Sequence, residues 1–195
     1  MSEYRIGIGV WNGVEELDFA GPYEVLTSWS RKSEREISVR LVAESTEPVT
    51  CSHGLRVLPD VSWDEVGALD LLVLPGGSTP PLLEDDDFLR RMRALKDAGT
   101  LMTSVCTGAL IFAKAGLLDG RPATTHWGSL EKLGGLGSGI RVDADARFVD
   151  DGDVVTAAGV SAGIDMALHL IARLESVERA QEVRRYIQYD PQPPV

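Results

Sequence analysis

Short apolar segments alternate with amphipathic helical patterns along most of the chain. Five runs of apolar and β-branched residues have the length of strands: 4–10, 37–43, 69–74, 101–105 and 154–158. In five other segments apolar residues recur at helical spacing, which predicts helices over 19–29, 88–98, 109–117, 161–174 and 177–188. Because strands and helices alternate, we predict an α/β fold in which a parallel sheet is sandwiched between helices.

Two further segments fall outside this alternation. Residues 49–52 and 55–58, separated by His53-Gly54, predict a β-hairpin. The sequence Pro191-Gln192-Pro193-Pro194 predicts an irregular tail. The chain has 195 residues and shows neither an internal repeat nor an interdomain linker, so we expect a single domain over residues 1–195.

Charge and composition narrow the possible partners. With 19 Lys and Arg against 30 Asp and Glu, the net charge is -11, and an acidic surface repels phosphate backbones. We therefore expect no nucleic-acid partner. The first ten residues form a predicted strand rather than a secretory signal, and no apolar run is long enough to span a membrane. With only two cysteines, the chain is expected to be cytoplasmic, with free thiols and no membrane partner.

Cys106 lies where a predicted strand passes directly into a predicted helix. The segment Thr103-Ser104-Val105-Cys106-Thr107-Gly108-Ala109-Leu110 leaves almost no room for a loop, as at a nucleophile elbow. The following helix would direct its N-terminal amides at the sulfur and lower the pKa of the thiol. The competing interpretation is a small buried apolar residue, but the carboxyl edge of an α/β sheet is where ligands bind. We therefore favour a reactive cysteine.

Three other segments carry candidate chemistry. Asp18 follows the first strand, and it either caps the next helix or approaches Cys106 and shares a proton with it. Glu15 and Glu16 are alternatives for the second role. Gly76 and Gly77 end the third strand, where they form either a plain turn or, with the Thr107 amide, an oxyanion hole.

The histidines and the second cysteine are harder to assign. His126, followed by Trp127, either activates Cys106 or is a structural histidine packed beside the indole. His169 falls within an apolar helix and is interpreted as structural. Cys51 and His53 supply only two metal ligands, too few for zinc, so Cys51 is also interpreted as structural.

These motifs resemble the ThiJ/PfpI superfamily over essentially the whole chain, with the isocyanide (isonitrile) hydratase branch as the nearest match. The matching segments are Leu17-Asp18-Phe19-Ala20-Gly21-Pro22, Pro75-Gly76-Gly77, Ser104-Val105-Cys106-Thr107-Gly108, Thr124-Thr125-His126-Trp127 and Ser161-Ala162-Gly163-Ile164-Asp165. The resemblance implies a flavodoxin-like, class I glutamine amidotransferase-like fold with a nucleophile elbow. It also implies a homodimer that needs no cofactor and no metal.

The same resemblance assigns roles to individual residues. It implies that Cys106 is the nucleophile, Asp18 the acid in contact with it, and Thr107 a residue lining the site. Gly76, Gly77, His126, Trp127 and Val160 are then expected to bind the substrate or its oxyanion. Thr107 stands where the peptidases of the superfamily have His, which argues against proteolysis. Ser78-Thr79-Pro80-Pro81 departs from the hydratase pattern, so the substrate preference can differ.

The implied activity is a cysteine-dependent hydratase, a lyase that converts an isocyanide to an N-substituted formamide through a thioimidate at Cys106. One alternative is a glyoxalase-type reaction on small α-oxoaldehydes, although those relatives usually carry Glu at the Asp18 position. A second is a ligand sensor without turnover, because AraC-type regulators carry similar motifs before a DNA-binding domain and this chain stops at Val195. A third is a redox sensor based on oxidation of Cys106.

Overall fold

A seven-stranded sheet forms the centre of the molecule. The computed structural model describes residues 3–192, so Pro193 and Pro194 of the predicted irregular tail lie outside the described residues. The sheet has the order β10-β11-β7-β6-β1-β2-β5. Its strands are β1 (Tyr4–Gly9), β2 (Ile37–Ala43), β5 (Val61–Ser62), β6 (Leu71–Leu74), β7 (Leu101–Val105), β10 (Phe148–Asp150) and β11 (Val154–Ala157). All neighbouring strands pair in parallel except β10 and β11, which are antiparallel.

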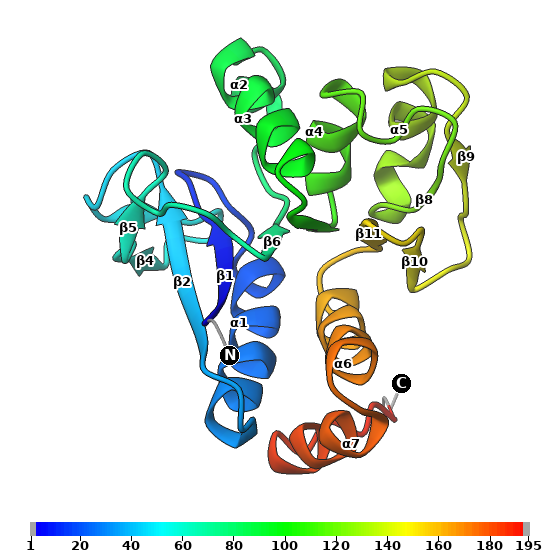
Figure 1. The fold of residues 1–195 in the computed structure, drawn as a ribbon. Helices are drawn as coiled ribbons and strands as arrows, with labels where there is room; N and C mark the ends of the chain where they lie inside the picture. The colour runs from blue at the N-terminus through cyan, green and yellow to red at the C-terminus, as the bar shows by residue number, and fades with distance from the viewer. Residues whose placement is uncertain (1–2, 193–195) are drawn as a thin grey trace.

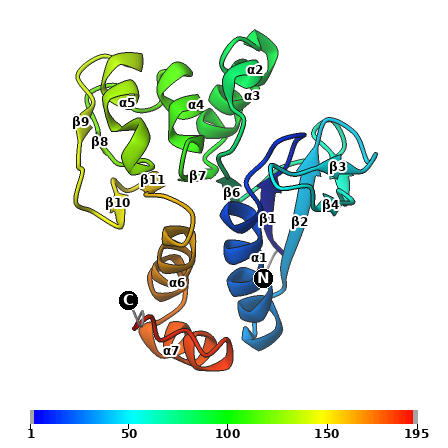
Figure 2. The same ribbon diagram turned by 180° about the vertical axis from the view of Figure 1, so that it is seen from behind.

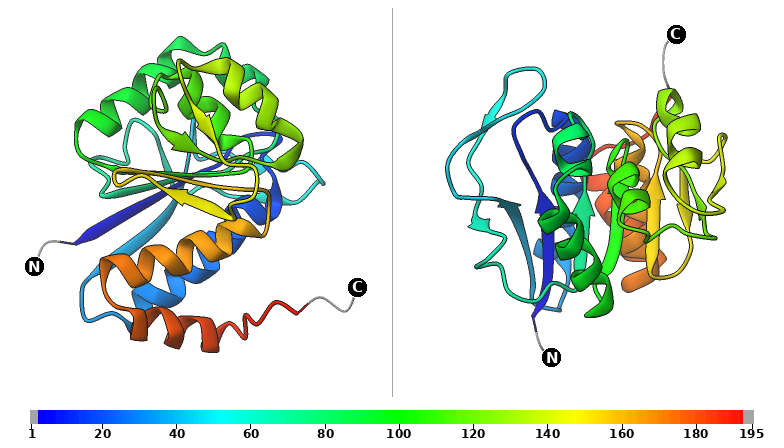
Figure 3. Two further views of the ribbon diagram at one scale, coloured as in Figure 1. Left: turned by 90° about the vertical axis from the view of Figure 1, so that its right-hand side faces the viewer. Right: turned by 90° about the horizontal axis from the view of Figure 1, so that it is seen from above.

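Helices cover both faces of this sheet (Figures 1 and 2). One layer contains α1 (Glu16–Lys32), α6 (Ala162–Leu174) and α7 (Val177–Tyr186). The other contains α2 (Pro80–Leu83), α3 (Asp86–Asp97), α4 (Gly108–Lys114) and α5 (Leu130–Leu136), with the 3-10 turn η1 (Trp127–Ser129) leading into α5. Figure 3 shows the sheet between the two layers. None of the helices in the described part of the chain combines the length and apolar character needed to cross a membrane.

The alternating side chains of the strands form two separate apolar cores. All four residues of β6 are buried, as expected for a parallel strand covered on both faces. Leu71 and Val73 pack with α1, α6 and α7, whereas Leu72 and Leu74 pack with α3 and α4. Successive side chains point to opposite faces of the sheet, and both faces are covered. Every residue of the strand is therefore apolar, and the run is uninterrupted rather than alternating.

The predicted α/β fold is confirmed, and the predicted 49–58 hairpin is present as β3 (Val49–Thr50) and β4 (Arg56–Val57). The structure adds elements that the pattern did not indicate: β5, α2, α5, β10 and the short pair β8 (Pro122–Ala123) and β9 (Arg141–Val142). Most of these are too short to produce a recognisable period. They extend the sheet edges and cover the α4 side of the molecule.

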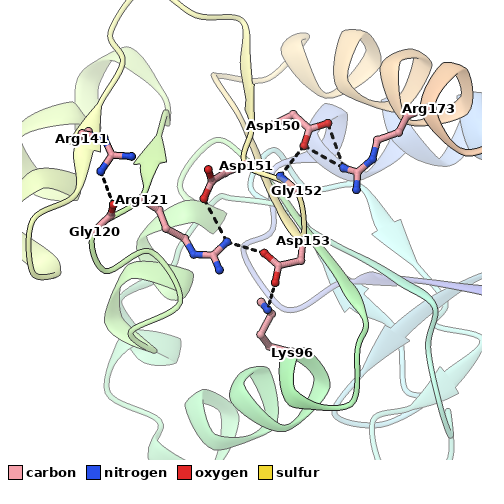
Figure 4. A network of polar contacts seen from close by, with 9 residues as sticks. All are labelled: Lys96, Gly120, Arg121, Arg141, Asp150, Asp151, Gly152, Asp153 and Arg173. Carbon is pink, nitrogen blue, oxygen red and sulfur yellow. Dashed lines mark hydrogen bonds and ion pairs between the residues drawn. The ribbon is translucent and has the colours of Figure 1, made fainter.

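An ion-pair network fixes the turn between β10 and β11 (Figure 4). Arg121 donates to Asp153 at 2.6 Å, and Lys96 of α3 contacts the other oxygen of the same carboxylate. On the other side of the turn, Asp150 accepts from Arg173 of α6 at 3.0 Å. The antiparallel edge of the sheet is thereby attached to both helical layers.

The strand order determines where a site can form. From β1 the chain moves outward in one direction to β2 and in the other through β6 and β7 to β11. The order therefore reverses between β1 and its neighbour β6, and the loops that follow these strands diverge at their carboxyl ends. The segments after β1, β6, β7 and β11 contain Asp18, Gly76, Cys106 and Val160, respectively.

Candidate active site

Cys106 occupies a strained turn between β7 and α4. Its φ of 56° lies in the left-handed region, which is unfavourable for a residue with a side chain. The surrounding backbone stabilises this conformation: the Cys106 N–H donates to the carbonyl of Ala158 at 2.9 Å, and the Cys106 carbonyl accepts from Thr125 Oγ1 at 2.7 Å. The expected sharp turn is therefore present, and it directs the sulfur toward the carboxyl edge of the sheet.

Glycines allow this turn to pack directly on the end of β6. A Cβ atom added at Gly108 would lie 2.2 Å from the Leu74 carbonyl oxygen, and one at Gly76 would lie 2.6 Å from the Thr107 nitrogen. Gly77 has a φ of +119° and faces the loop after β1, where a Cβ would lie 2.3 Å from the Gly13 oxygen. Real Cβ atoms essentially never come this close to backbone atoms, so no other residue fits these positions without rearrangement.

Asp18 is buried beside the thiol rather than at the cap of a helix. Helix α1 begins at Glu16, so Asp18 lies in its first turn, and the capping interpretation is wrong. One carboxyl oxygen, Oδ2, accepts from the Gly76 N–H at 2.8 Å. The other oxygen, Oδ1, is buried and accepts no hydrogen bond from the described N–H and O–H groups. The Cys106 thiol is close enough for each group to alter the pKa of the other.

Burial dominates the protonation of this pair. It raises the pKa of Asp18 to about 7, an effect opposed by the Gly76 N–H and reinforced by the charge of Glu15. Burial and then the Asp18 charge raise the pKa of Cys106 to about 12. The amides of Thr107 and Val160 act in the opposite direction but do not prevail. The effect of Thr107, at the start of α4, is the one anticipated from the sequence, whereas that of Val160 comes from the turn after β11. The expected lowering of the thiol pKa is therefore wrong, and the two groups hold at least one proton between them at neutral pH.

Four backbone amides lie in the segments around Cys106 and Asp18, and two of them already donate hydrogen bonds to side chains of the protein. Gly76 donates to Asp18, and Gly77 donates to Thr107 Oγ1 at 3.0 Å, while the Thr107 hydroxyl donates back to the Gly77 carbonyl at 3.2 Å. The two glycine amides are thus not free to bind a substrate oxygen. The remaining donors, the amides of Thr107 and Val160, face the sulfur. Val160 also has a left-handed φ, 46°, so its amide is held there by a strained turn after β11.

His126 and Trp127 line a neighbouring cavity. His126 Nδ1 accepts from the Gly128 N–H at 3.2 Å, so in the neutral ring the proton lies on Nε2. Its ring packs against Gly159, where an added Cβ would lie 2.4 Å from Cδ2. Within the described residues no hydrogen bond joins His126 to Cys106, so the geometry favours the structural interpretation of this histidine over direct activation of the thiol.

The other candidates lie away from the thiol. Glu16 accepts from the His53 N–H at 2.8 Å and pairs with His53 Nδ1 at 2.9 Å, which joins the β3–β4 hairpin to the start of α1. Cys51 is buried in the core, and His169 pairs with Asp150 at 2.7 Å. Cys51 and His169 fit the structural roles expected of them, whereas Glu16, an alternative to Asp18 as the partner of Cys106, is bonded to His53 instead.

Two residues near the site carried no clear signal in the sequence. Thr125 fixes the Cys106 carbonyl. It belongs to one of the segments that carry the family resemblance, but the sequence assigned it no role, because a threonine in a loop is uninformative until that loop is placed. Arg147 lines the cavity beside Trp127 and precedes β10, a strand too short to predict. Its guanidinium donates to Asp165 at 2.9 Å through Nε.

A cysteine on a strained strand–helix turn, paired with a buried carboxyl at the switch point of an α/β sheet, defines the class of protein. The DJ-1/PfpI family profile matches residues 4–173, and the chain belongs to this family. The chain is 39% identical to the isonitrile hydratase of Pseudomonas putida over 191 residues, covering 97% of this chain and 80% of that protein.

Other relatives show how widely this domain is used. The chain is 32% identical to the HTH-type transcriptional regulator CdhR of Pseudomonas aeruginosa, over 70% of this chain and 40% of the regulator. Among solved structures, a ThiJ/PfpI family protein from Pseudomonas syringae superposes with a TM-score of 0.90 at 33% identity, covering 100% of this chain and 78% of that one. Drosophila melanogaster DJ-1beta superposes with a TM-score of 0.86 at 24% identity, covering 97% and 100%, and shares the fold.

Proposed function

We propose that this protein is a cysteine-dependent hydratase that converts an isocyanide to an N-substituted formamide. The observation that carries the proposal is the buried Cys106–Asp18 pair, which holds a nucleophile and a proton donor within one enclosed site. The similarity to an isonitrile hydratase over 97% of the chain supports the same reaction. An isocyanide needs both groups, because its terminal carbon is protonated as it is attacked.

The reaction begins with the thiol proton. Asp18, as a carboxylate, accepts the proton of the Cys106 thiol and transfers it to the terminal carbon of the isocyanide while the sulfur attacks that carbon. The product is the thioimidate R–N=CH–S–Cys106, which contains the isocyanide and the thiol and nothing else. Thr107 and Val160 amides that face the sulfur stabilise the thiolate as it forms.

Water completes the cycle. With the Asp18 carboxylate as general base, water adds its hydroxyl to the thioimidate carbon, and its proton reaches the nitrogen. The tetrahedral intermediate then expels the sulfur, which recovers a proton from the hydroxyl group as the carbonyl forms. The sum is one isocyanide and one water converted to one formamide, with the Cys106 thiol regenerated.

The pKa values predict the pH dependence of this cycle. Below about pH 7 Asp18 is protonated and cannot accept the thiol proton, so kcat/KM should fall as the pH decreases through that value. The experiment is formamide production from a simple alkyl isocyanide by the wild type, Cys106→Ala and Asp18→Asn. We expect no turnover by Cys106→Ala and a loss of at least about a hundredfold for Asp18→Asn. Undiminished turnover by Cys106→Ala would refute the mechanism.

A second candidate function is ligand sensing without chemistry. The similarity to transcriptional regulators, 32% over 70% of the chain for CdhR, favours it. It would be supported by ligands that bind wild type and Cys106→Ala with the same affinity and are recovered unchanged. A glyoxalase-type reaction on α-oxoaldehydes remains the enzymatic alternative, and the same assay with an α-oxoaldehyde distinguishes it by its hydroxy-acid product.

We also propose a cytoplasmic homodimer formed by a single domain. The support is the resemblance to the ThiJ/PfpI superfamily. Sedimentation equilibrium of the whole chain tests the dimer directly, since one chain weighs 21.1 kDa.

A further inference from the structure

Trp127 is the most exposed large apolar side chain of the described residues. Its relative exposure is 80%, although an indole gains more than most side chains from being buried. The side chain is not simply free at the surface: its ring lies 5.2 Å from that of His126, at an interplanar angle of 37°. His126 is in turn packed against Gly159 and receives the Gly128 N–H, so it supports one side of the indole and the other remains open.

This aromatic pair borders a cavity that adjoins the catalytic cysteine. The cavity has a volume of about 300 Å³, the lower end of the range for small-molecule sites. Three of its lining residues contact Cys106: the Thr125 hydroxyl donates to the Cys106 carbonyl, the Ala158 carbonyl accepts from the Cys106 N–H, and the Val160 amide faces the sulfur. Cys106 itself is not part of the cavity lining, so the substituent of a molecule bonded to the sulfur would reach this cavity by passing Val160. The cavity has room for a single ring rather than an extended chain.

The lining limits the charge of that substituent. Besides His126, Trp127 and Thr125, the cavity is lined by small or aliphatic residues and by one charged side chain, Arg147. Two contacts of the guanidinium, Nε to Asp165 at 2.9 Å and Nη2 to Ser161 Oγ at 3.2 Å, hold it in position. A cationic substituent would meet this guanidinium without any carboxylate in the cavity lining to compensate it.

We propose that Trp127 is a specificity-determining residue that selects isocyanides with a flat aromatic substituent, uncharged or anionic, by stacking against its open face. The proposal rests on the proposed function, since it assigns a place to the substituent of that substrate. Stacking between aromatic rings favours a planar ring over a puckered ring with the same number of carbons. Phenyl and cyclohexyl isocyanides differ in this respect and are therefore a matched pair of probes.

The first experiment compares turnover of these two isocyanides by wild type, Trp127→Ala and Trp127→Phe. For phenyl isocyanide, Trp127→Ala should raise KM about five- to tenfold with kcat within about twofold, because stacking is present in ground and transition states alike. The rise for cyclohexyl isocyanide should be much smaller, and Trp127→Phe should restore most of the preference. Tyr186→Ala, which removes an exposed aromatic ring from α7, is the matched control and should change neither KM.

A second experiment separates this inference from the proposed reaction. Formanilide, the product expected from phenyl isocyanide, is titrated by calorimetry into Cys106→Ala and into the Cys106→Ala/Trp127→Ala double variant. Binding that weakens about five- to tenfold without Trp127 supports the aromatic site even if no isocyanide is hydrated, in which case only the proposed function fails. Equal affinity for the two variants would overturn the inference. So would a change in sedimenting mass caused by Trp127→Ala, because the indole would then be a subunit contact.

Discussion

Asp18 is a buried carboxyl with no cation among the groups that shift its pKa. It is fully buried, and the groups that act on it are an amide N–H, the Glu15 carboxylate and the Cys106 thiol. Its pKa rises from 3.8 to about 7 on folding, so the folded state binds a proton more tightly than the unfolded state does. This contribution to stability is complete below pH 3.8 and is lost as the pH rises through about 7.

Replacement of Asp18 by Asn should therefore stabilise the protein at alkaline pH. Asn keeps an oxygen for the Gly76 N–H and carries no charge to be buried. A difference of about three pKa units corresponds to roughly 4 kcal/mol. We expect Asp18→Asn to match wild type only below about pH 4, to exceed it increasingly as the pH rises toward 7, and to exceed it by up to that amount at pH 8, in urea unfolding followed by circular dichroism. Asp97→Asn, a surface change in α3, is the control, and a constant difference across pH would contradict the argument.

The contrast between Cys106 and Asp18 shows what the sequence reveals at the residue scale. Cys106 is recognisable because a strand pattern and a helix pattern meet at it. Asp18 is ambiguous because the first residue of a helix is hard to locate from the sequence. Helix α1 begins at Glu16, two residues before Asp18. The direction of the thiol pKa shift was mispredicted for a related reason. The local effect of a helix N-terminus can be read from the sequence, but the degree of burial and the distance to Asp18 are properties of the tertiary structure.

At the scale of elements, the passage from β7 to α4 depends on contact with β6. A Cβ at Gly108 would lie 2.2 Å from the Leu74 oxygen and 2.7 Å from the Pro75 oxygen, both backbone atoms that cannot rotate away. Helix α4 would have to move away from the end of β6. The amide of Thr107, at the start of this helix, would then move away from the sulfur.

Gly108→Ala and Gly135→Ala form a matched pair of tests for this contact. Both glycines lie in short helices, but a Cβ at Gly135 meets nothing within 4 Å. We expect Gly135→Ala to stabilise the protein by about 0.5–1 kcal/mol, and Gly108→Ala to destabilise it by several kcal/mol. Urea unfolding at one pH checks both values. Similar effects of the two changes would show that the elbow is not tightly packed on β6.

The elements that the pattern predicted are those that the core requires. Strands β1, β2, β6, β7 and β11 and helices α1, α3, α4, α6 and α7 each bury a periodic set of apolar side chains, and all ten were predicted. Strands of two or three residues cannot show a period, so β5 and β10 went unnoticed. Helix α5 contains two adjacent glycines, which oppose helix formation by local propensity, and it forms because Leu133 is buried against the α4 side.

At the scale of the whole molecule, the site joins segments that are far apart in the chain. Asp18, Gly76, Cys106 and Val160 follow four different strands and meet only because the sheet order places those strands side by side. The sequence predicted the sheet and the carboxyl edge, and the resemblance supplied the pairing of Cys106 with Asp18. Which amides face the sulfur could not be predicted, because that depends on the left-handed backbone at Cys106 and Val160.

The two cores on opposite faces of the sheet provide a test of the single-domain proposal. Met92 and Met166 are fully buried, one in each core, and strands β2, β6, β7 and β11 contribute side chains to both. If the chain folds as one unit, Met92→Ala and Met166→Ala should each cost about 2–5 kcal/mol and shift the same transition.

Trp63 and Trp29 report on the two cores, so variants retaining one or the other as the only tryptophan can follow each core by fluorescence. Coincident midpoints with both reporters in both methionine variants are expected. A midpoint that moves for one reporter alone would show that the two faces unfold separately, and the site between them would then form only when both cores are intact.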